Sequence, residues 1–476
     1  MRRGLALVAM VASGSLATAA ERPGAPASER LQAALERSGA SETQAVWVFL
    51  RDRAGAPPAV TGLTPRALSR RQVRGVGPLV TDADRPLAAP YVDQVTRTVT
   101  RVRHASRWLN AVSVDATPTQ IAALRALPFV ERLDLVARFQ RRPESDSPVA
   151  RASSARRSRA AIDYGPSLGQ LAQIGVPDLH AFGLSGEGVV VAVFDAGFDN
   201  LTHEAFASMK ILAQYDFVNG DLDVSNGSDR GEGSHGTSTL SVLGGFADGM
   251  LVGPAYGAYF LLAKTEDTTR ETPVEEDHWA AAAEWAEAAG ADVISSSLGY
   301  LTYDTGFRSY TAAQMDGDTA ISTRAADLAA ERGVVVVNSA GNDGLDSTHN
   351  TLGAPADGHG VVAVGAVDGS GRRATFSSVG PSADGRIKPD VAAQGQAVIA
   401  AGSGTSSSYR FVNGTSFSCP LTAGVAALLL QAHPEATAEQ VRAALRASGS
   451  QAAAPNNLLG WGIVNAPRAV DFLEAR

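Results

Sequence analysis

The sequence predicts an α/β protein whose larger part is a mainly parallel central sheet covered by helices. Near-continuous apolar runs recur in the C-terminal two thirds of the chain, at 188–195, 291–299, 333–341 and 360–367. Runs of this kind are typical of parallel strands that are buried on both faces. Alanine-rich amphipathic segments that end at a glycine lie between them, at 275–290 and 319–333. Strands that alternate with helices favour a sheet sandwiched between helix layers.

Length and composition agree with this fold class. The chain has 476 residues, of which 45% are apolar and 19% charged, and we expect two or three domains. The single cysteine excludes an internal disulfide, so the hydrophobic core alone must stabilise the fold. The arginines of the N-terminal part are scattered through apolar segments, a pattern that argues against a nucleic-acid-binding surface.

The first twenty residues have the pattern of a signal peptide. Arg2 and Arg3 are followed by the apolar run LALVAMVA and by small residues near Ala19 and Ala20. The run is too short to span a bilayer, so we expect export of the protein rather than an N-terminal membrane anchor.

Residues 21–140 predict a small α/β domain. Strands are expected at 45–51, 108–114 and 130–139, where β-branched and aromatic residues gather. A helix is expected after the second strand, with Thr117 as its N-cap and Pro118 at its first position.

Residues 141–160 are rich in Arg, Ser, Pro and Ala without periodicity, and predict an exposed linker. The linker also divides the charge of the chain. Residues 21–160 contain 23 Lys and Arg against 13 Asp and Glu, a net charge of +10, whereas 161–476 contain 16 against 36, a net charge of −20. With Arg2 and Arg3 these values sum to the −8 of the whole chain. We expect the two parts to attract each other.

Four polar residues are candidates for catalysis because they follow strands or begin helices, where reactive groups of such folds gather. They are Asp195, His235, Asn342 and Ser416. Ser418 and Cys419 lie close to Ser416, but Ser418 lacks the preceding Gly-Thr, and the apolar neighbours of Cys419 favour a packing role.

The segments around these residues resemble the motifs of subtilisin-like serine proteases. The segments are DAGFD at 195–199, HGTSTLS at 235–241, SAGND at 339–343 and GTSFSCP at 414–420, in the order of the family. The resemblance implies a subtilisin-like three-layer sandwich with a mainly parallel central sheet over 161–476. The front domain, 21–140, resembles the family's ferredoxin-like propeptide, which assists folding and then inhibits.

The resemblance also implies a role for each candidate. Ser416 would be the nucleophile, His235 its base, and Asp195 the residue that orients the imidazole. Asn342 would donate to the oxyanion together with the backbone N–H of Ser416. The chemistry would proceed through an acyl-enzyme without a cofactor. Substrate would lie extended between two segments of small residues, Ser297, Leu298 and Gly299 on one side and Ser339, Ala340 and Gly341 on the other.

A structural calcium ion is a weaker expectation. Asp221, Asp223, Ser225 and Glu232 have the spacing of a calcium loop, but Asn226 stands where such a loop needs glycine. A solvated loop that leads to His235 is the favoured interpretation of the segment. Relatives often bind calcium elsewhere, at sites that the sequence does not identify.

The interpretation is a secreted serine endopeptidase that is made as a self-inhibited precursor and acts on peptides or proteins. We expect a monomer with no stable membrane anchor, and a mature enzyme that begins near Ala160 after cleavage in the linker. The alternatives are a binding protein on the same fold, a hydrolase of esters or lipids, and a front domain that is never removed.

Overall fold

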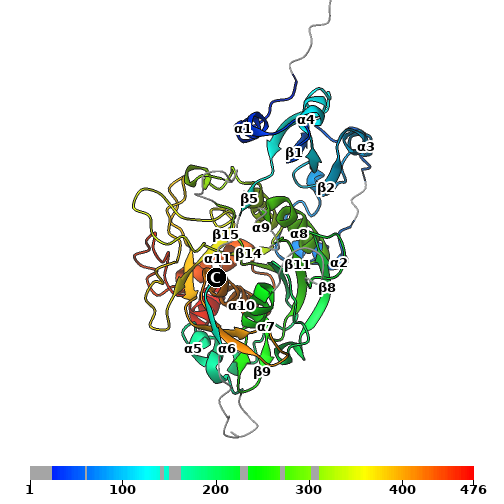
Figure 1. The fold of residues 1–476 in the computed structure, drawn as a ribbon. Helices are drawn as coiled ribbons and strands as arrows, with labels where there is room; N and C mark the ends of the chain where they lie inside the picture. Colours follow the sequence, from blue (N-terminus) through cyan, green and yellow to red (C-terminus); the bar gives the residue numbers. More distant parts are fainter. Residues whose placement is uncertain are drawn as a thin grey trace, which may run out of the picture.

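The structure, a computed structural model, describes residues 24–58, 62–139, 144–148, 162–225, 234–267, 274–301 and 310–475. A seven-stranded sheet in the order β16-β15-β14-β13-β7-β11-β8 forms the centre of the larger part, and all its strand pairs are parallel (Figure 1). The strands are β7 (Val190–Asp195), β8 (Lys210–Asp216), β11 (Tyr259–Lys264), β13 (Val293–Ser296), β14 (Val335–Ser339), β15 (Val361–Val367) and β16 (Val391–Gln394). This confirms the predicted parallel sheet.

The two faces of the sheet are covered by different helices. In β7, Val191 and Val193 belong to the core beneath α10 (Thr415–Ala432) and α7 (Ser234–Gly244), whereas Ala192 and Phe194 belong to the core beneath α8 (Glu276–Ala289) and α9 (Ile321–Glu331). Successive residues of a strand point to opposite faces of the sheet, so the apolar residues of β7 contribute to both hydrophobic cores. The helices α11 (Ala438–Ser448) and α12 (Ala466–Glu474) pack beside α10.

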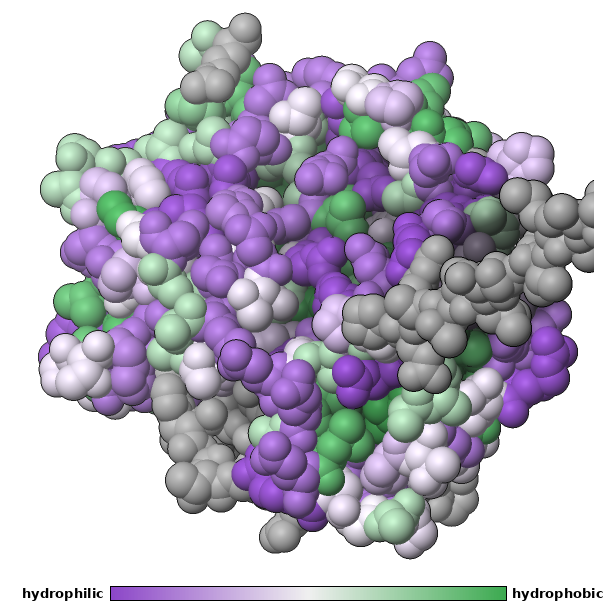
Figure 2. Space-filling model, turned by 90° about the horizontal axis from the view of Figure 1, so that it is seen from above, coloured by the Kyte–Doolittle hydropathy of each residue, from purple (hydrophilic) through white to green (hydrophobic). Residues whose placement is uncertain are grey.

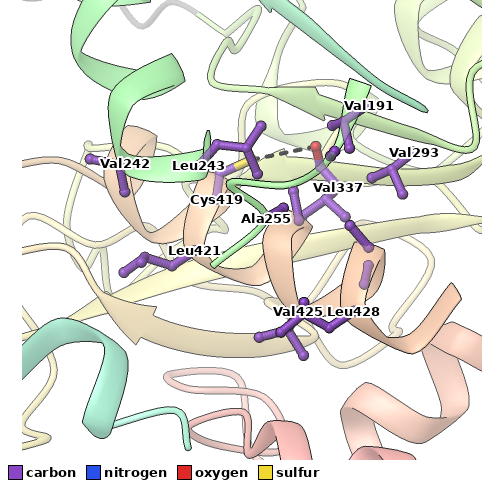
Figure 3. Packing of buried hydrophobic residues seen from close by; sticks show 14 of the residues in the cluster. Val191, Val242, Leu243, Ala255, Val293, Val337, Cys419, Leu421, Val425 and Leu428 are labelled. Atoms are coloured by element: carbon purple, nitrogen blue, oxygen red, sulfur yellow. Dashed lines mark hydrogen bonds between the residues drawn. The ribbon is translucent and has the colours of Figure 1, made fainter. Parts of the chain in front are cut away.

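The helix α10 crosses the sheet as the central core helix. Figure 3 shows Cys419, Leu421, Val425 and Leu428 of this helix among valines of the strands, with the Cys419 thiol directed at the carbonyl of Val337. Among the described residues, α10 alone has the length and hydropathy of a membrane-spanning helix. Because 89% of that stretch is buried inside the protein, its apolar character is explained by the core.

The front part of the chain forms a four-stranded antiparallel sheet in the order β2-β3-β1-β4. Its strands are β1 (Gln44–Leu50), β2 (Arg101–Ser106), β3 (Ala111–Ala116) and β4 (Val130–Leu135), and its helices are α1 (Glu29–Arg37), α3 (Ala89–Thr98) and α4 (Pro118–Arg125). The helices pack on one face. The other face, with Trp47 and Phe49, packs against Trp279 of the larger part. This confirms the ferredoxin-like domain, and Thr117 caps α4 as predicted.

The helix α2 (Pro65–Val73) leaves the front sheet and lies against α8 of the larger part (Figure 1). The remaining short elements are α5 (Leu168–Ala172), α6 (Val176–Ala181), β5 (Arg138–Phe139), β6 (Asp146–Pro148), β9 (Phe246–Ala247), β10 (Leu251–Val252), β12 (Val274–Glu275), β17 (Val398–Ala401) and β18 (Tyr409–Val412). Over most of the face seen in Figure 2, polar and apolar residues are interspersed.

Residues 145–148 of the linker are exposed, as expected, but the segment is paired with the body of the protein. Before it, β5 pairs antiparallel with β12, and within it, β6 pairs antiparallel with β18. The residues between these two strand pairs include Glu144, whose side chain is only 13% exposed. The backbone of residues 146–148 is hydrogen-bonded to β18. Sequence periodicity cannot reveal this pairing, because β6 has only three residues.

Candidate active site

Asp195 and His235 form a hydrogen-bonded pair at the carboxyl end of the central sheet. Asp195 is the last residue of β7 and is fully buried, and His235 is the second residue of α7. Nδ1 of His235 lies 2.6 Å from Oδ1 of Asp195. Thr239, one helical turn after His235, donates to Oδ2 of the same carboxylate at 2.8 Å. Both carboxylate oxygens therefore have partners, so the imidazole is held in one orientation with Nε2 directed away from Asp195.

Glycine at position 236 allows this arrangement. A Cβ atom there would lie 2.2 Å from the carbonyl oxygen of Gly197 and 3.0 Å from Cβ of Asp195. The first turn of α7 can therefore approach the end of β7 only because residue 236 has no side chain.

Asn342 lies beyond the end of β14 and is oriented by the residue before Ser416. Its Oδ1 accepts hydrogen bonds from the backbone N–H and the hydroxyl of Thr415, both at 2.9 Å. An amide whose oxygen is fixed in this way presents its NH₂ group on the opposite side. Nδ2 of Asn342 donates to Oε1 of Glu144 at 2.8 Å.

Ser416 is the second residue of α10 and is 4% exposed. Its hydroxyl donates to Oε1 of Glu144 at 2.7 Å, and Oε2 of the same carboxylate lies 3.2 Å from Nε2 of His235. Ser416, His235 and Asn342 thus converge on one carboxylate group. The structure brings together all four residues that the sequence predicts, although they are spread over more than 200 positions of the chain.

The neighbours of Ser416 lie in different surroundings. Ser418 and Cys419 are fully buried. The Cys419 thiol is directed at the carbonyl oxygens of Ser296 and Val337, both at 3.4 Å, and burial raises the pKa of the thiol to about 12. A thiol with such a pKa carries almost no thiolate near neutral pH, and it is not a nucleophile. This confirms the predicted packing role of Cys419.

The predicted substrate-binding residues lie at the ends of two neighbouring strands: the first segment follows β13, and the second begins with Ser339, the last residue of β14. The hydroxyl of Ser297 donates to the carbonyl of Ser416 at 2.7 Å, and the carbonyl of Leu298 accepts from Asn338 at 2.9 Å. Gly341 has a φ of 117°, a conformation that favours glycine. The two segments flank the start of α10, where Ser297 contacts Ser416 and Gly341 contacts Thr415. The other predicted residues of the two segments are Gly299, Ser339 and Ala340.

Three residues of the site were missed by sequence reasoning. Thr239 and Thr415 lie inside the catalytic motifs, one helical turn after His235 and one position before Ser416, so spacing could have found them. Glu144 lies in an arginine- and serine-rich segment without any motif. Only the tertiary structure shows that its carboxylate enters the site.

The expected calcium loop is described in part. Asp221 and Asp223 are exposed, and the carboxylate of Asp223 accepts from the hydroxyl of Ser225 at 2.5 Å, which lowers the pKa of Asp223. Glu232 lies outside the described residues. In the part of the chain that the structure describes, no group of three His, Cys, Asp or Glu side chains could hold a metal ion.

Two known protein families match long stretches of the chain. Residues 186–462 match the model of the subtilase family, Peptidase_S8, and residues 45–155 match a peptidase S8 propeptide domain of Bacteroidota. The chain belongs to the subtilase family. It is a serine endopeptidase that carries a propeptide of this family.

Three subtilisins are 31% to 32% identical to the chain. Subtilisin of Bacillus pumilus is 32% identical over 301 residues, which are 63% of this chain and 97% of that protein. Subtilisin E of Bacillus subtilis (strain 168) is 32% identical, with 59% of this chain and 65% of that protein covered. Subtilisin DY of Bacillus licheniformis is 31% identical, with 61% and 94% covered.

Among solved structures, fervidolysin from Fervidobacterium pennivorans, described as a keratinolytic enzyme related to subtilisin, has the same fold with a TM-score of 0.65. The likeness covers 95% of this chain and 64% of the fervidolysin chain, at 24% identity. At this identity the likeness shows the fold alone.

Proposed function

We propose that the protein is a secreted endopeptidase that hydrolyses peptide bonds with an Asp195-His235-Ser416 triad. The observation that carries the proposal is the convergence of Ser416, His235 and Asn342 on one acceptor group, with Asp195 behind the imidazole. When a substrate is bound, its scissile carbonyl would take the place of this acceptor group, the carboxylate of Glu144.

In the first step the hydroxyl oxygen of Ser416 attacks the carbonyl carbon, while Nε2 of His235 takes the hydroxyl proton. Asp195 keeps the other imidazole nitrogen protonated through the 2.6 Å hydrogen bond and stabilises the imidazolium. The imidazolium then gives its proton to the leaving amine, and an acyl-enzyme remains. A water molecule repeats the same steps and releases the acid, so no cofactor is needed.

Asn342 would stabilise the negative charge that develops on the carbonyl oxygen. Its Nδ2 group is already directed at an acceptor oxygen that lies 2.7 Å from the Ser416 hydroxyl. The backbone N–H of Ser416, in the first turn of α10, would be the second donor.

Substrate would extend along Ser297, Leu298 and Gly299, with Ser339, Ala340 and Gly341 as the second wall. The small residues of these segments favour a roomy pocket for large apolar side chains. The pairing of β5 with β12 suggests that the substrate strand continues along Val274–Glu275.

The maturation scheme rests on the match of 45–155 to a family propeptide. Residues 1–20 would direct export, 21–140 would form the inhibitory propeptide domain, and cleavage within 141–160 would free the catalytic domain, 161–476. The basic front part packs against the acidic body through ion pairs such as that of Arg103 with Asp277 at 2.7 Å. Calcium at 221–232 is proposed only as a structural ion.

Fluorophosphonate labelling of the purified protein tests the proposal. We expect a single label on the peptide that contains Ser416, none in Ser416→Ala, and a new N-terminus within 141–160. A label on another residue, or an active preparation that keeps the front domain, would contradict it. Turnover of matched peptide and ester substrates separates an endopeptidase from an esterase.

A further inference from the structure

The carboxylate of Glu144 occupies the position where a substrate carbonyl would lie. Oε1 is 2.7 Å from the Ser416 hydroxyl and 2.8 Å from Nδ2 of Asn342, and Oε2 is 3.2 Å from Nε2 of His235. The backbone of Gly414 forms the remaining wall. A Cβ atom on Gly414 would lie 2.5 Å from Oε1, so the carboxylate fits there only because residue 414 is glycine.

The chain on the C-terminal side of Glu144 is fixed to the body. The carbonyl of Ser145 accepts from the backbone N–H of Asn413 at 3.2 Å and from its side-chain amide at 3.1 Å. Asp146 forms an ion pair with Arg410, and β6 continues the sheet of β18. Several contacts outside the catalytic centre therefore set the position of Glu144. Its side chain enters the catalytic centre, but the contacts that anchor the segment are made by other residues.

A carboxylate at this position opposes catalysis for two reasons. The side-chain donor of Asn342, which would stabilise an oxyanion, is used by Oε1, so no carbonyl oxygen can reach it. The Ser416 hydroxyl donates to Glu144 instead of His235, and Nε2 of His235 faces Oε2 of the same carboxylate, so the imidazole is not in position to accept the serine proton.

We propose that Glu144 is an internal inhibitory residue, and that the catalytic centre is a binding site for the carboxylate of an acidic peptide. In the precursor this ligand is the segment 144–148, which the enzyme holds as an inhibitor and not as a substrate. The proposal rests on Ser416 being the nucleophile.

The first test compares full-length variants. In Glu144→Gln the side chain keeps its size but loses its charge and with it the charge-assisted hydrogen bonds. We expect fluorophosphonate to label the intact Glu144→Gln chain about tenfold faster than the intact wild type, and self-cleavage to quicken by a similar factor. Glu331→Gln is the matched control, since it makes the same change at an exposed residue at the end of α9, away from the segment 144–148, and it should react at the wild-type rate.

The outcomes separate the two proposals. Equal labelling of Glu144→Gln and wild type overturns the inhibitory role but leaves the triad intact. An equal acceleration in Glu331→Gln also overturns it, because the loss of any one carboxylate would then have the same effect as the loss of the Glu144 charge. Absence of any label at Ser416 in the processed enzyme overturns the function itself.

The second test does not depend on the folding of a variant. A synthetic peptide of residues 138–148 should inhibit the processed wild-type enzyme, and the same peptide with glutamine at 144 should need about tenfold more for half inhibition. Equal inhibition by the two peptides, or cleavage of both at equal rates, would contradict the proposal.

Discussion

Asn342 and Thr415 show how one residue orients another at the active site. The two hydrogen bonds from Thr415 fix the amide oxygen of Asn342, so the amide nitrogen points to the place where charge would develop. The orientation exists before any substrate arrives, and such preorganised donors are the groups that contribute most to stabilisation of a transition state.

Replacement of Asn342 by leucine, which has a similar volume, should lower kcat by about 10²–10³ with little change in KM, the magnitude known for this donor in subtilisin itself. Thr415→Val leaves the donor but removes one of the two bonds that orient it, so a smaller loss of kcat is expected. Steady-state kinetics on one peptide substrate measure both. If Asn342→Leu raised KM and left kcat unchanged, the side chain would contribute to substrate binding and not to stabilisation of the transition state, which would contradict the prediction.

Sequence reasoning works for residues whose chemistry fixes their local pattern. Asp195, His235 and Ser416 could be found because each lies in a short motif on a definite element. Glu144 could not be found, since its role depends on two short strand pairs on either side of it and on the shape left open by Gly414. No periodicity or motif in its own segment reflects those contacts.

At the scale of elements, helix α2 attaches the propeptide to the amino-terminal end of the central strand β13. The catalytic residues lie at the opposite, carboxyl-terminal ends of the strands. Arg71 forms ion pairs with Asp84 at 2.8 Å and with Glu287 at 2.9 Å, and Arg70 forms another with Glu287. Arg74 contacts Asp292, directly before β13, at 2.7 Å. These arginines are 1% to 4% exposed, so they bind the body in an environment that excludes water.

Removal of one partner from such a buried cluster leaves uncompensated charge. We expect Arg71→Met in the inactive Ser416→Ala precursor to lower the free energy that holds α2 on the body by about 3–5 kcal/mol. Hydrogen exchange of residues 62–87 measures this loss. Arg372→Ala, which breaks an exposed pair with Asp368, is the control and should leave the exchange unchanged. Wild-type protection in Arg71→Met would show that apolar contacts alone hold the helix.

Elements were predicted where the pattern was long, and missed where it was short. Four of the seven strands of the central sheet, β7, β13, β14 and β15, and the helices α8 and α9 were recognised because their apolar runs extend over whole elements, whereas β8, β11 and β16 were not recognised. The strand β2, with the sequence RVRHAS, was not recognised, because its polar residues that contact α8, Arg103 with Asp277 and His104 with His278, look like exposed residues in the sequence. The charge difference between the two parts predicted that such pairs exist but not where they lie.

At the scale of the whole molecule, the interface between propeptide and body contains a histidine pair that makes it sensitive to pH. Nε2 of His104 on β2 lies 2.7 Å from Nδ1 of His278 on α8. Burial, and then the neighbouring His278, lower the pKa of His104 to about 3. Asp277, Arg103 and Arg101 also face this pair, and only Asp277 favours the protonated form.

The direction of the pH effect follows from this pKa. A released propeptide exposes His104, which then titrates near pH 6.5, whereas the docked form stays neutral down to about pH 3. Docking is therefore strongest above pH 6.5 and weakens as the pH falls from 6.5 towards 3, by about tenfold per pH unit for one proton. Burial raises the pKa of Glu284 at the same interface, which acts in the opposite sense, so the test compares His104→Gln with wild type.

In the Ser416→Ala precursor, hydrogen exchange of residues 101–116, corrected for the intrinsic rate at each pH, should show wild-type protection that falls between pH 7 and pH 5. His104→Gln lacks the titrating group, and its protection should change less over the same range. Parallel profiles for the two proteins would contradict the role of His104 and assign the pH dependence to the carboxylates. A steeper loss in the wild type would mean that an acidic compartment loosens the propeptide from its enzyme without any cleavage.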